Sequence, residues 1–127
     1  MKSVLRKELS IVRRAQSLRH AVRGVAVFVR ITPNFWVHFL TLAALILLGI
    51  FFHLSPGEWT ILILASALVI AAEAVNSTIE IDMNLTHPGR HDMVRDTKDI
   101  AAGAVLIAGV TAWIIDLLIF LQHVHMH

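Results

Sequence analysis

Three long apolar stretches alternate with short polar segments along this chain of 127 residues. The apolar stretches cover residues 35–52, 59–83 and 100–121. A helix rises about 1.5 Å per residue, so each stretch is long enough to span roughly 30 Å of hydrocarbon. The pattern therefore predicts three transmembrane helices, over residues 34–53, 59–84 and 99–121.

The first 31 residues have a different pattern, in which apolar residues stand among basic ones at helical spacing. The apolar positions include Val4, Leu5, Leu9, Val12, Leu18, Val22, Val25 and Val29. This spacing is typical of a helix in the membrane interface, with its arginines toward anionic headgroups. Thr32-Pro33-Asn34 ends the helix, because proline lacks a backbone donor and disfavours helical geometry in the preceding residue. We expect a surface helix over residues 1–31, either a topology anchor or a segment that grips the substrate.

Composition agrees with a membrane protein of one domain over residues 1–127. Hydrophobic residues make up 57% of the chain, whereas about 45–50% is usual in soluble domains, and the mean hydropathy is +0.72. Cysteine is absent, which excludes disulfides and thiolate chemistry. No cleavable signal-peptide pattern opens the chain, so we expect its N-terminus to be retained.

The basic residues predict the orientation in the membrane. Of the eleven Lys and Arg, eight lie between Lys2 and Arg30 and three follow the second span, at Arg90, Arg95 and Lys98. Residues 53–58 have none. The positive-inside rule then places the N-terminus and residues 86–99 in the cytoplasm, with the 53–58 turn and the C-terminus outside.

Four polar side chains gather at the cytoplasmic end of the second span. Glu73, Asn76, Ser77 and Glu80 follow an i, i+3, i+4, i+7 pattern and share one helix face. Counted from Trp59, Glu73 lies about 21 Å and Glu80 about 31 Å along the helix, near the inner membrane boundary. Carboxylates that face lipid cost a few kcal/mol each, so these should face protein, water or a cation. The depth favours chemistry between a lipid and a water-soluble cosubstrate.

The same residues carry a family resemblance. The run Glu73-x-x-Asn76-Ser77-x-Ile79-Glu80, followed after about eighteen residues by Lys98-Asp99-Ile100-Ala101-Ala102-Gly103, resembles the signature of the small prokaryotic integral-membrane diacylglycerol kinases and their undecaprenol kinase branch. Arg23-Gly24 and Pro33-Asn34-Phe35-x-x-His38 support it. The resemblance covers residues from about 13 to 121. It implies a homotrimer in the prokaryotic inner membrane, each subunit having a surface helix and three spans.

The activity implied by the resemblance is transfer of the γ-phosphoryl group of Mg-ATP to a lipid hydroxyl, as from diacylglycerol to phosphatidic acid. Glu73 is then the general base, Asn76 a positioning group and Glu80 a Mg²⁺ ligand. Phosphoryl transfer asks mainly for positioning, charge neutralisation and an aligned base, which these residue types can supply. No Gly-x-x-x-x-Gly-Lys-Ser/Thr loop occurs, so carboxylates, Mg²⁺ and lysine would hold the phosphates.

The resemblance also implies how the substrates are held. Lys98 contacts the ATP phosphates, Asp99 holds Lys98 or the nucleotide, and His91 lies in a cytoplasmic loop that touches the nucleotide. Further nucleotide contacts are implied for Arg13 and His20, and lipid contacts for Arg23, Gly24 and Glu73. The expected partners are a membrane lipid, ATP and further copies of the chain, with no nucleic acid.

Two positions depart from the family pattern. Thr32 stands where the family has a metal-binding Glu before Pro33-Asn34, and Asn84 replaces an acidic residue four positions after Glu80. Thr32 has a hydroxyl and no charge, so full occupancy of the metal site is in question, and Asp96 of the cytoplasmic loop is a candidate substitute ligand. A catalytically weakened adaptor of the same fold is therefore one alternative.

Other interpretations of the same residues remain open at this stage. Diacylglycerol and undecaprenol are both candidate acceptors, and the Asn34-Phe35-x-x-His38 element is more similar to the undecaprenol branch. Glu73 and Asn76 could instead be interhelical hydrogen-bonding groups. A small proton-coupled transporter would need four spans and a mid-membrane Glu, which the pattern does not show. Asp116 has no assigned role, and the alternating histidines over residues 123–127 form at most a loose metal site.

Overall fold

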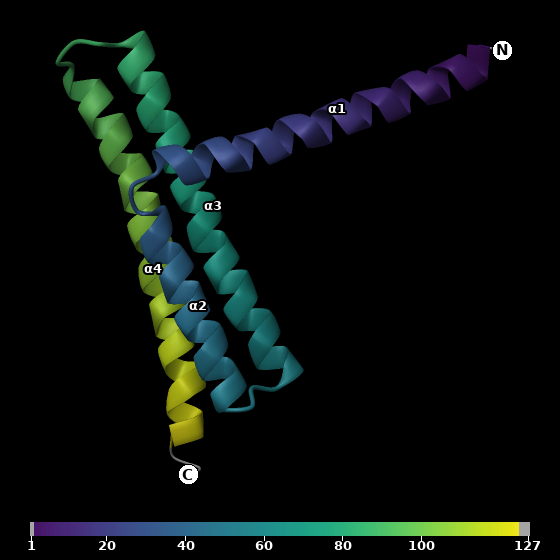
Figure 1. Cartoon of the computed structure of the whole chain (residues 1–127). Helices are drawn as coiled ribbons and strands as arrows, with labels where there is room; N and C mark the ends of the chain where they lie inside the picture. The colour runs from purple at the N-terminus through teal and green to yellow at the C-terminus, as the bar shows by residue number, and fades with distance from the viewer. Residues whose placement is uncertain (1, 125–127) are drawn as a thin grey trace. The chain divides into compact units, whose positions relative to one another are not determined.

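The computed structural model describes the backbone of residues 2–124 and the side chains of residues 10–124. The described residues form four helices, namely α1 (Lys2–Ile31), α2 (Phe35–Phe51), α3 (Pro56–Thr86) and α4 (Asp92–Val124) (Figure 1). Contacts divide the chain into two units, one of α1 with the link that follows it and one of α2, α3 and α4. The all-α fold predicted from the sequence is confirmed.

Two helices, α3 and α4, are each long and apolar enough to cross a membrane. α2 has 17 residues without a charged side chain, and it counts as a third candidate span only when joined to the helix before it. α3 and α4 are longer than the predicted spans. The polar residues 92–99, predicted as a lead into the third span, already form the first turns of α4.

The first unit consists of α1, the link 32–34 and Phe35, the first residue of α2. The link closes tightly, because the Thr32 N–H donates to the Phe28 carbonyl at 3.0 Å and the Phe35 N–H to the Thr32 carbonyl at 3.1 Å. The Phe28 and Phe35 rings meet edge to face at 5.9 Å. Apolar side chains of α1 such as Val12 are exposed, as expected for a surface helix whose apolar side faces a membrane.

In the second unit, α3 and α4 pack side by side as an antiparallel pair (Figure 1). Their contact has two small cores. One contains Leu54, Leu62 and Ile119, with Leu45 of α2 among the partly buried residues packed against it. The other contains Ala65, Val69 and Ala112. Small side chains in the second core let the two helices approach closely, which is a common way to pack helices in a membrane.

The end of this unit with the α2–α3 turn, residues 49–62 and 115–124, is called the turn end below. Here the Leu54 N–H donates to the Gly49 carbonyl at 3.0 Å. Ser55 caps α3 through its side chain, and Glu58 completes a capping box. A Cβ built on Gly49 would lie 2.6 Å from a ring carbon of Trp59, so only glycine allows this approach of α2 to α3.

Candidate active site

The opposite end of the α3–α4 pair, residues 80–99, is called the loop end. α3 ends at Thr86, where the His87 N–H donates to the Met83 carbonyl at 3.0 Å. Pro88 cannot continue the helix ladder, since it lacks an N–H, and α4 begins at Asp92. The five-residue loop 87–91 thus turns the chain between two long helices.

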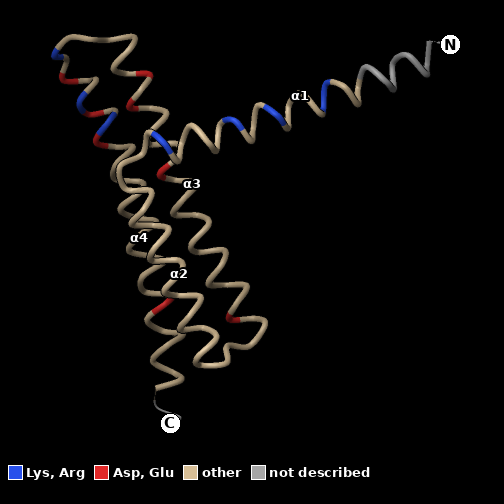
Figure 2. Tube along the Cα trace, viewed as in Figure 1, with Lys and Arg blue, Asp and Glu red and all other residues tan. Residues whose placement is uncertain are grey.

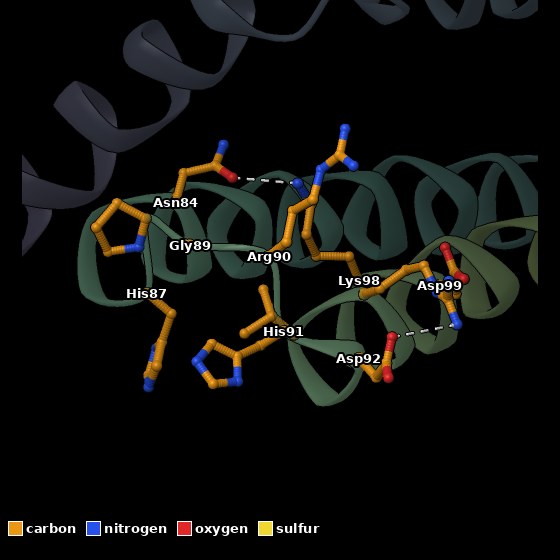
Figure 3. Close-up of a pocket in the computed structure, with 11 residues that line it drawn as sticks. Asn84, His87, Gly89, Arg90, His91, Asp92, Lys98 and Asp99 are labelled. Carbon is orange, nitrogen blue, oxygen red and sulfur yellow. Dashed lines mark hydrogen bonds and ion pairs between the residues drawn. The ribbon is translucent and has the colours of Figure 1, made fainter.

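A cleft of about 880 Å³ lies at the loop end, between the last turn of α3, the loop and the first turns of α4 (Figure 3). It is lined by Asn84, His87, Pro88, Gly89, Arg90, His91, Asp92, Val94, Arg95, Lys98 and Asp99. Three of these side chains are cationic and two are anionic, which leaves the lining with a net charge of +1 when both histidines are neutral. Such a lining favours an anionic ligand.

Basic residues are concentrated at the loop end and on α1. Among residues 10–124, Lys and Arg lie only on α1 and at the loop end (Figure 2). Arg95 pairs with Asp92 at 3.8 Å and with Asp96 at 3.9 Å. These side chains are more than half exposed, so their ion pairs are weak and leave the charges available to a ligand.

Lys98 joins the two helices at the loop end. Its ammonium donates a hydrogen bond to Asn84 Oδ1 at 3.1 Å and lies 3.8 Å from Glu80 Oε1. The structure therefore brings together Lys98, the predicted phosphate contact, and Glu80, the predicted metal ligand. Asp99 and His91, predicted as nucleotide contacts, line the same cleft (Figure 3).

The predicted catalytic residues lie deeper along α3. Glu73 is buried, with 6% of its surface exposed, Asn76 is half-buried, and the side chain of Glu80 is 57% exposed. Seven residues correspond to about two turns or roughly 10 Å of helix. One helix face thus runs from a buried carboxylate to an open, cationic cleft.

The remaining predicted residues belong to the first unit. Arg13, His20, Arg23 and Gly24 are exposed on α1. His20 and Arg23 line a shallow depression of that helix together with Gln16 and Arg19. Their roles stay predictions, as does that of Thr32, whose side chain is buried in the link after α1.

The carboxylates of the site fit a metal ion that arrives with phosphates. Within the described part of the chain, no three His, Asp or Glu side chains cluster closely enough to hold a metal. Mg²⁺ is commonly bound by one or two carboxylates together with substrate phosphates and waters, and Glu80 can supply one carboxylate. His123 of the C-terminal histidine group contacts Glu58 at 3.7 Å, while residues 125–127 lie outside the described residues.

Sequence reasoning missed part of the cleft. Asn84 was recognised as a departure from the family pattern, and Arg90 and Arg95 only as topology signals, yet all three line the cleft. The grouping of three basic residues within nine positions after a membrane helix was the available signal. Their convergence depends on the loop, which brings the start of α4 back beside the end of α3.

Comparison with known proteins identifies the family. The family model for prokaryotic diacylglycerol kinase matches residues 19–120. The chain is 36% identical to the undecaprenol kinase of Bacillus subtilis over 106 residues, 84% of this chain and 86% of that protein. It is 35% identical to a diacylglycerol kinase of Synechocystis over 100 residues, 78% of this chain and 57% of that protein. No solved structure matches significantly. The chain belongs to the prokaryotic diacylglycerol kinase family and is a lipid kinase, a phosphotransferase with an alcohol acceptor.

Proposed function

We propose that this kinase transfers the γ-phosphoryl group of Mg-ATP to the hydroxyl of a membrane lipid, diacylglycerol or undecaprenol. The observation that carries the proposal is the single α3 face on which a buried carboxylate, Glu73, leads to the cationic cleft at the loop end. The first of these groups lies near the depth of the inner membrane boundary, where the hydroxyl of a membrane lipid would be presented. A nucleotide can reach the second from water.

The cleft residues bind and orient the nucleotide in this proposal. Lys98 and the arginines of the cleft neutralise phosphate oxygens, and Asp99 and His91 contact the rest of the nucleotide. Mg²⁺, when bound with ATP, spreads the charge of the phosphates, and Glu80 is the carboxylate that would hold it. Positioning and charge neutralisation supply most of the rate in such reactions.

Glu73 acts as the general base. It accepts the proton of the lipid hydroxyl while the hydroxyl oxygen bonds to the γ-phosphorus and the bond from that phosphorus to the β–γ bridging oxygen breaks, so that ADP leaves. Burial of Glu73, at 6% exposure, keeps bulk water from this base and so favours the lipid over hydrolysis. Asn76, about one turn away on the same face, positions the base or the acceptor.

The proposal extends to location and assembly. The site and the N-terminus face the cytoplasm of a prokaryotic inner membrane, because the basic residues gather on α1 and at the loop end (Figure 2). The C-terminus lies outside. Three copies form the active trimer, and Arg13 and His20 contact the nucleotide while Arg23 and Gly24 contact the lipid.

Transfer of labelled γ-phosphate from Mg-ATP in mixed micelles tests the proposal and names the acceptor. Diacylglycerol, undecaprenol and the water-soluble alcohol glycerol are offered separately to the wild-type protein. We expect label on one of the two lipids and none on glycerol. A folded protein that labels neither lipid would contradict the proposal, and failure to bind Mg-ATP as well would favour an adaptor disabled by Thr32.

A further inference from the structure

Asn84 contacts Lys98, the residue to which the proposed function assigns the nucleotide phosphates. Its Oδ1 accepts the Lys98 hydrogen bond at 3.1 Å, which is within the usual range for an N–H···O bond. The Glu80 oxygen at 3.8 Å is too far for a direct hydrogen bond. The ammonium is therefore hydrogen-bonded to the neutral amide and only loosely paired with the neighbouring carboxylate.

The geometry of α3 explains why both groups reach one lysine. Glu80 and Asn84 are four residues apart, so they lie one above the other on the face that α4 meets. Asn84 lines the cleft and Glu80 does not. Figure 3 shows the hydrogen bond from the Lys98 ammonium to the Asn84 carbonyl oxygen among the residues that line the cleft.

The loose pairing of Lys98 with Glu80 leaves both groups available for the proposed reaction. A direct pair between Lys98 and Glu80 would satisfy both charges at once, because charge-assisted hydrogen bonds are short and strong. Lys98 would then be less available to phosphate, and Glu80 less available to a metal ion. Loss of Glu80 as a metal ligand would matter in this chain, because Thr32 supplies no second carboxylate.

We propose that Asn84 is a positioning residue, which keeps the ion pair of Lys98 and Glu80 loose so that the lysine can bind phosphate and the carboxylate can bind the metal ion. The inference rests on the proposed function. Asn84 itself need not touch the nucleotide, because it acts through Lys98.

Replacement of Asn84 by leucine tests this inference. Asn84→Leu retains most of the volume and removes the acceptor, so Lys98 closes on Glu80. We expect the KM for ATP and the Mg²⁺ concentration for half-maximal rate to rise about three- to tenfold, with kcat within about twofold. Asn84→Gln keeps an uncharged amide acceptor on the same helix face, so both values should stay within about threefold of wild type.

A double-mutant cycle separates this role from a structural one. If Asn84 acts through Lys98, Asn84→Leu has no further effect on the KM for ATP in a Lys98→Met background. Asp82→Asn is the matched control, since Asp82 lies two residues away, is exposed and has no side-chain contact with Lys98 among those described. It should leave both constants unchanged.

The outcomes also separate this inference from the proposed function. The inference is overturned if Asn84→Leu behaves as wild type, if its effect persists in the Lys98→Met background, or if Asn84→Gln weakens binding as much as Asn84→Leu does. In those cases wild type still binds Mg-ATP and Lys98→Met still weakens it. Failure of the wild-type protein to bind Mg-ATP would overturn the proposed function together with the inference.

Discussion

Each end of the α3–α4 pair has a glutamate of α3 beside a basic side chain of α4, but the two pairs differ in hydrogen bonding and exposure. At the turn end, Glu58 Oε2 accepts hydrogen bonds from the Ser55 N–H and hydroxyl, both at 2.8 Å, and lies 3.7 Å from His123 Nε2. The side chains of Glu58 and His123 are only 21% and 12% exposed. At the loop end, Glu80 and Lys98 are more exposed, at 57% and 34%, and meet only at 3.8 Å.

The difference indicates which end can bind a ligand. At the turn end, hydrogen bonds from Ser55 occupy Oε2 of Glu58. The core that contains Leu62 belongs to the same end. At the loop end, charged groups are loosely paired around an open cleft, so a phosphate or metal ion can replace their partners at low cost. A carboxylate at the turn end stabilises structure, whereas one at the loop end is available for chemistry.

The largest expected effect comes from replacing Glu73, which lies between the two ends on the α3 face that leads to the loop end. Glu73→Gln removes the proposed base, so the rate of phosphate transfer to lipid should fall about 10²- to 10⁴-fold. Glu58→Gln, the matched change at the turn end, should keep the rate within about twofold and lower thermal stability instead. Initial rates and unfolding midpoints in detergent measure both, and a larger rate loss in Glu58→Gln would contradict the comparison.

A smaller effect is expected from packing at the turn end. Gly49→Ala places a Cβ 2.6 Å from the Trp59 ring and 3.1 Å from Leu54, which should cost about 1–3 kcal/mol of stability. Gly109→Ala is the control, because nothing lies within 4 Å of its Cβ position and alanine favours a helix. Thermal unfolding should show a lower midpoint for the first variant and an equal or higher one for the second. Equal midpoints would show that α2 does not pack closely on α3.

The smallest effect is a pH dependence of stability at the turn end. Hydrogen bonds from the Ser55 backbone and hydroxyl lower the pKa of Glu58 below its ordinary value of 4.5, with a smaller contribution from His123. Because the folded-state pKa is lowered, this stabilisation is complete above the unfolded-state value and disappears as the pH falls through the folded-state value. The midpoint temperature of unfolding should therefore decrease in wild type as the pH is lowered past 4.5. It should change less in Glu58→Gln. Identical profiles for both proteins would refute the assignment.

The helices were predictable from the length and hydropathy of the apolar stretches. The polar face of α3 was predictable from the helical spacing of Glu73 and Glu80. The helical start of α4 was not recognised, because residues 92–99 are polar. In the structure an i, i+3 pair between Asp92 and Arg95 spans its first turn. Family resemblance supplied the roles of the site residues, which local patterns alone could not assign.

Contacts between helices lay beyond sequence reasoning. The hydrogen bond between Asn84 and Lys98 joins residues fourteen positions apart, and its existence depends on how the five-residue loop sets the register of α3 against α4. The pair of Glu58 and His123 joins the beginning of α3 to the end of α4, which depends on the lengths of both helices. Such registers follow from packing, and no periodic pattern encodes them.

Amide hydrogen exchange of the full-length protein in detergent tests the central claim, that the loop end is where nucleotide binds. Exchange is compared with and without Mg²⁺ and a non-hydrolysable ATP analogue. The account predicts slower exchange over residues 84–99, with residues 53–62 and 115–123 unchanged. Protection at the turn end, or none at the loop end although the analogue binds, would contradict it.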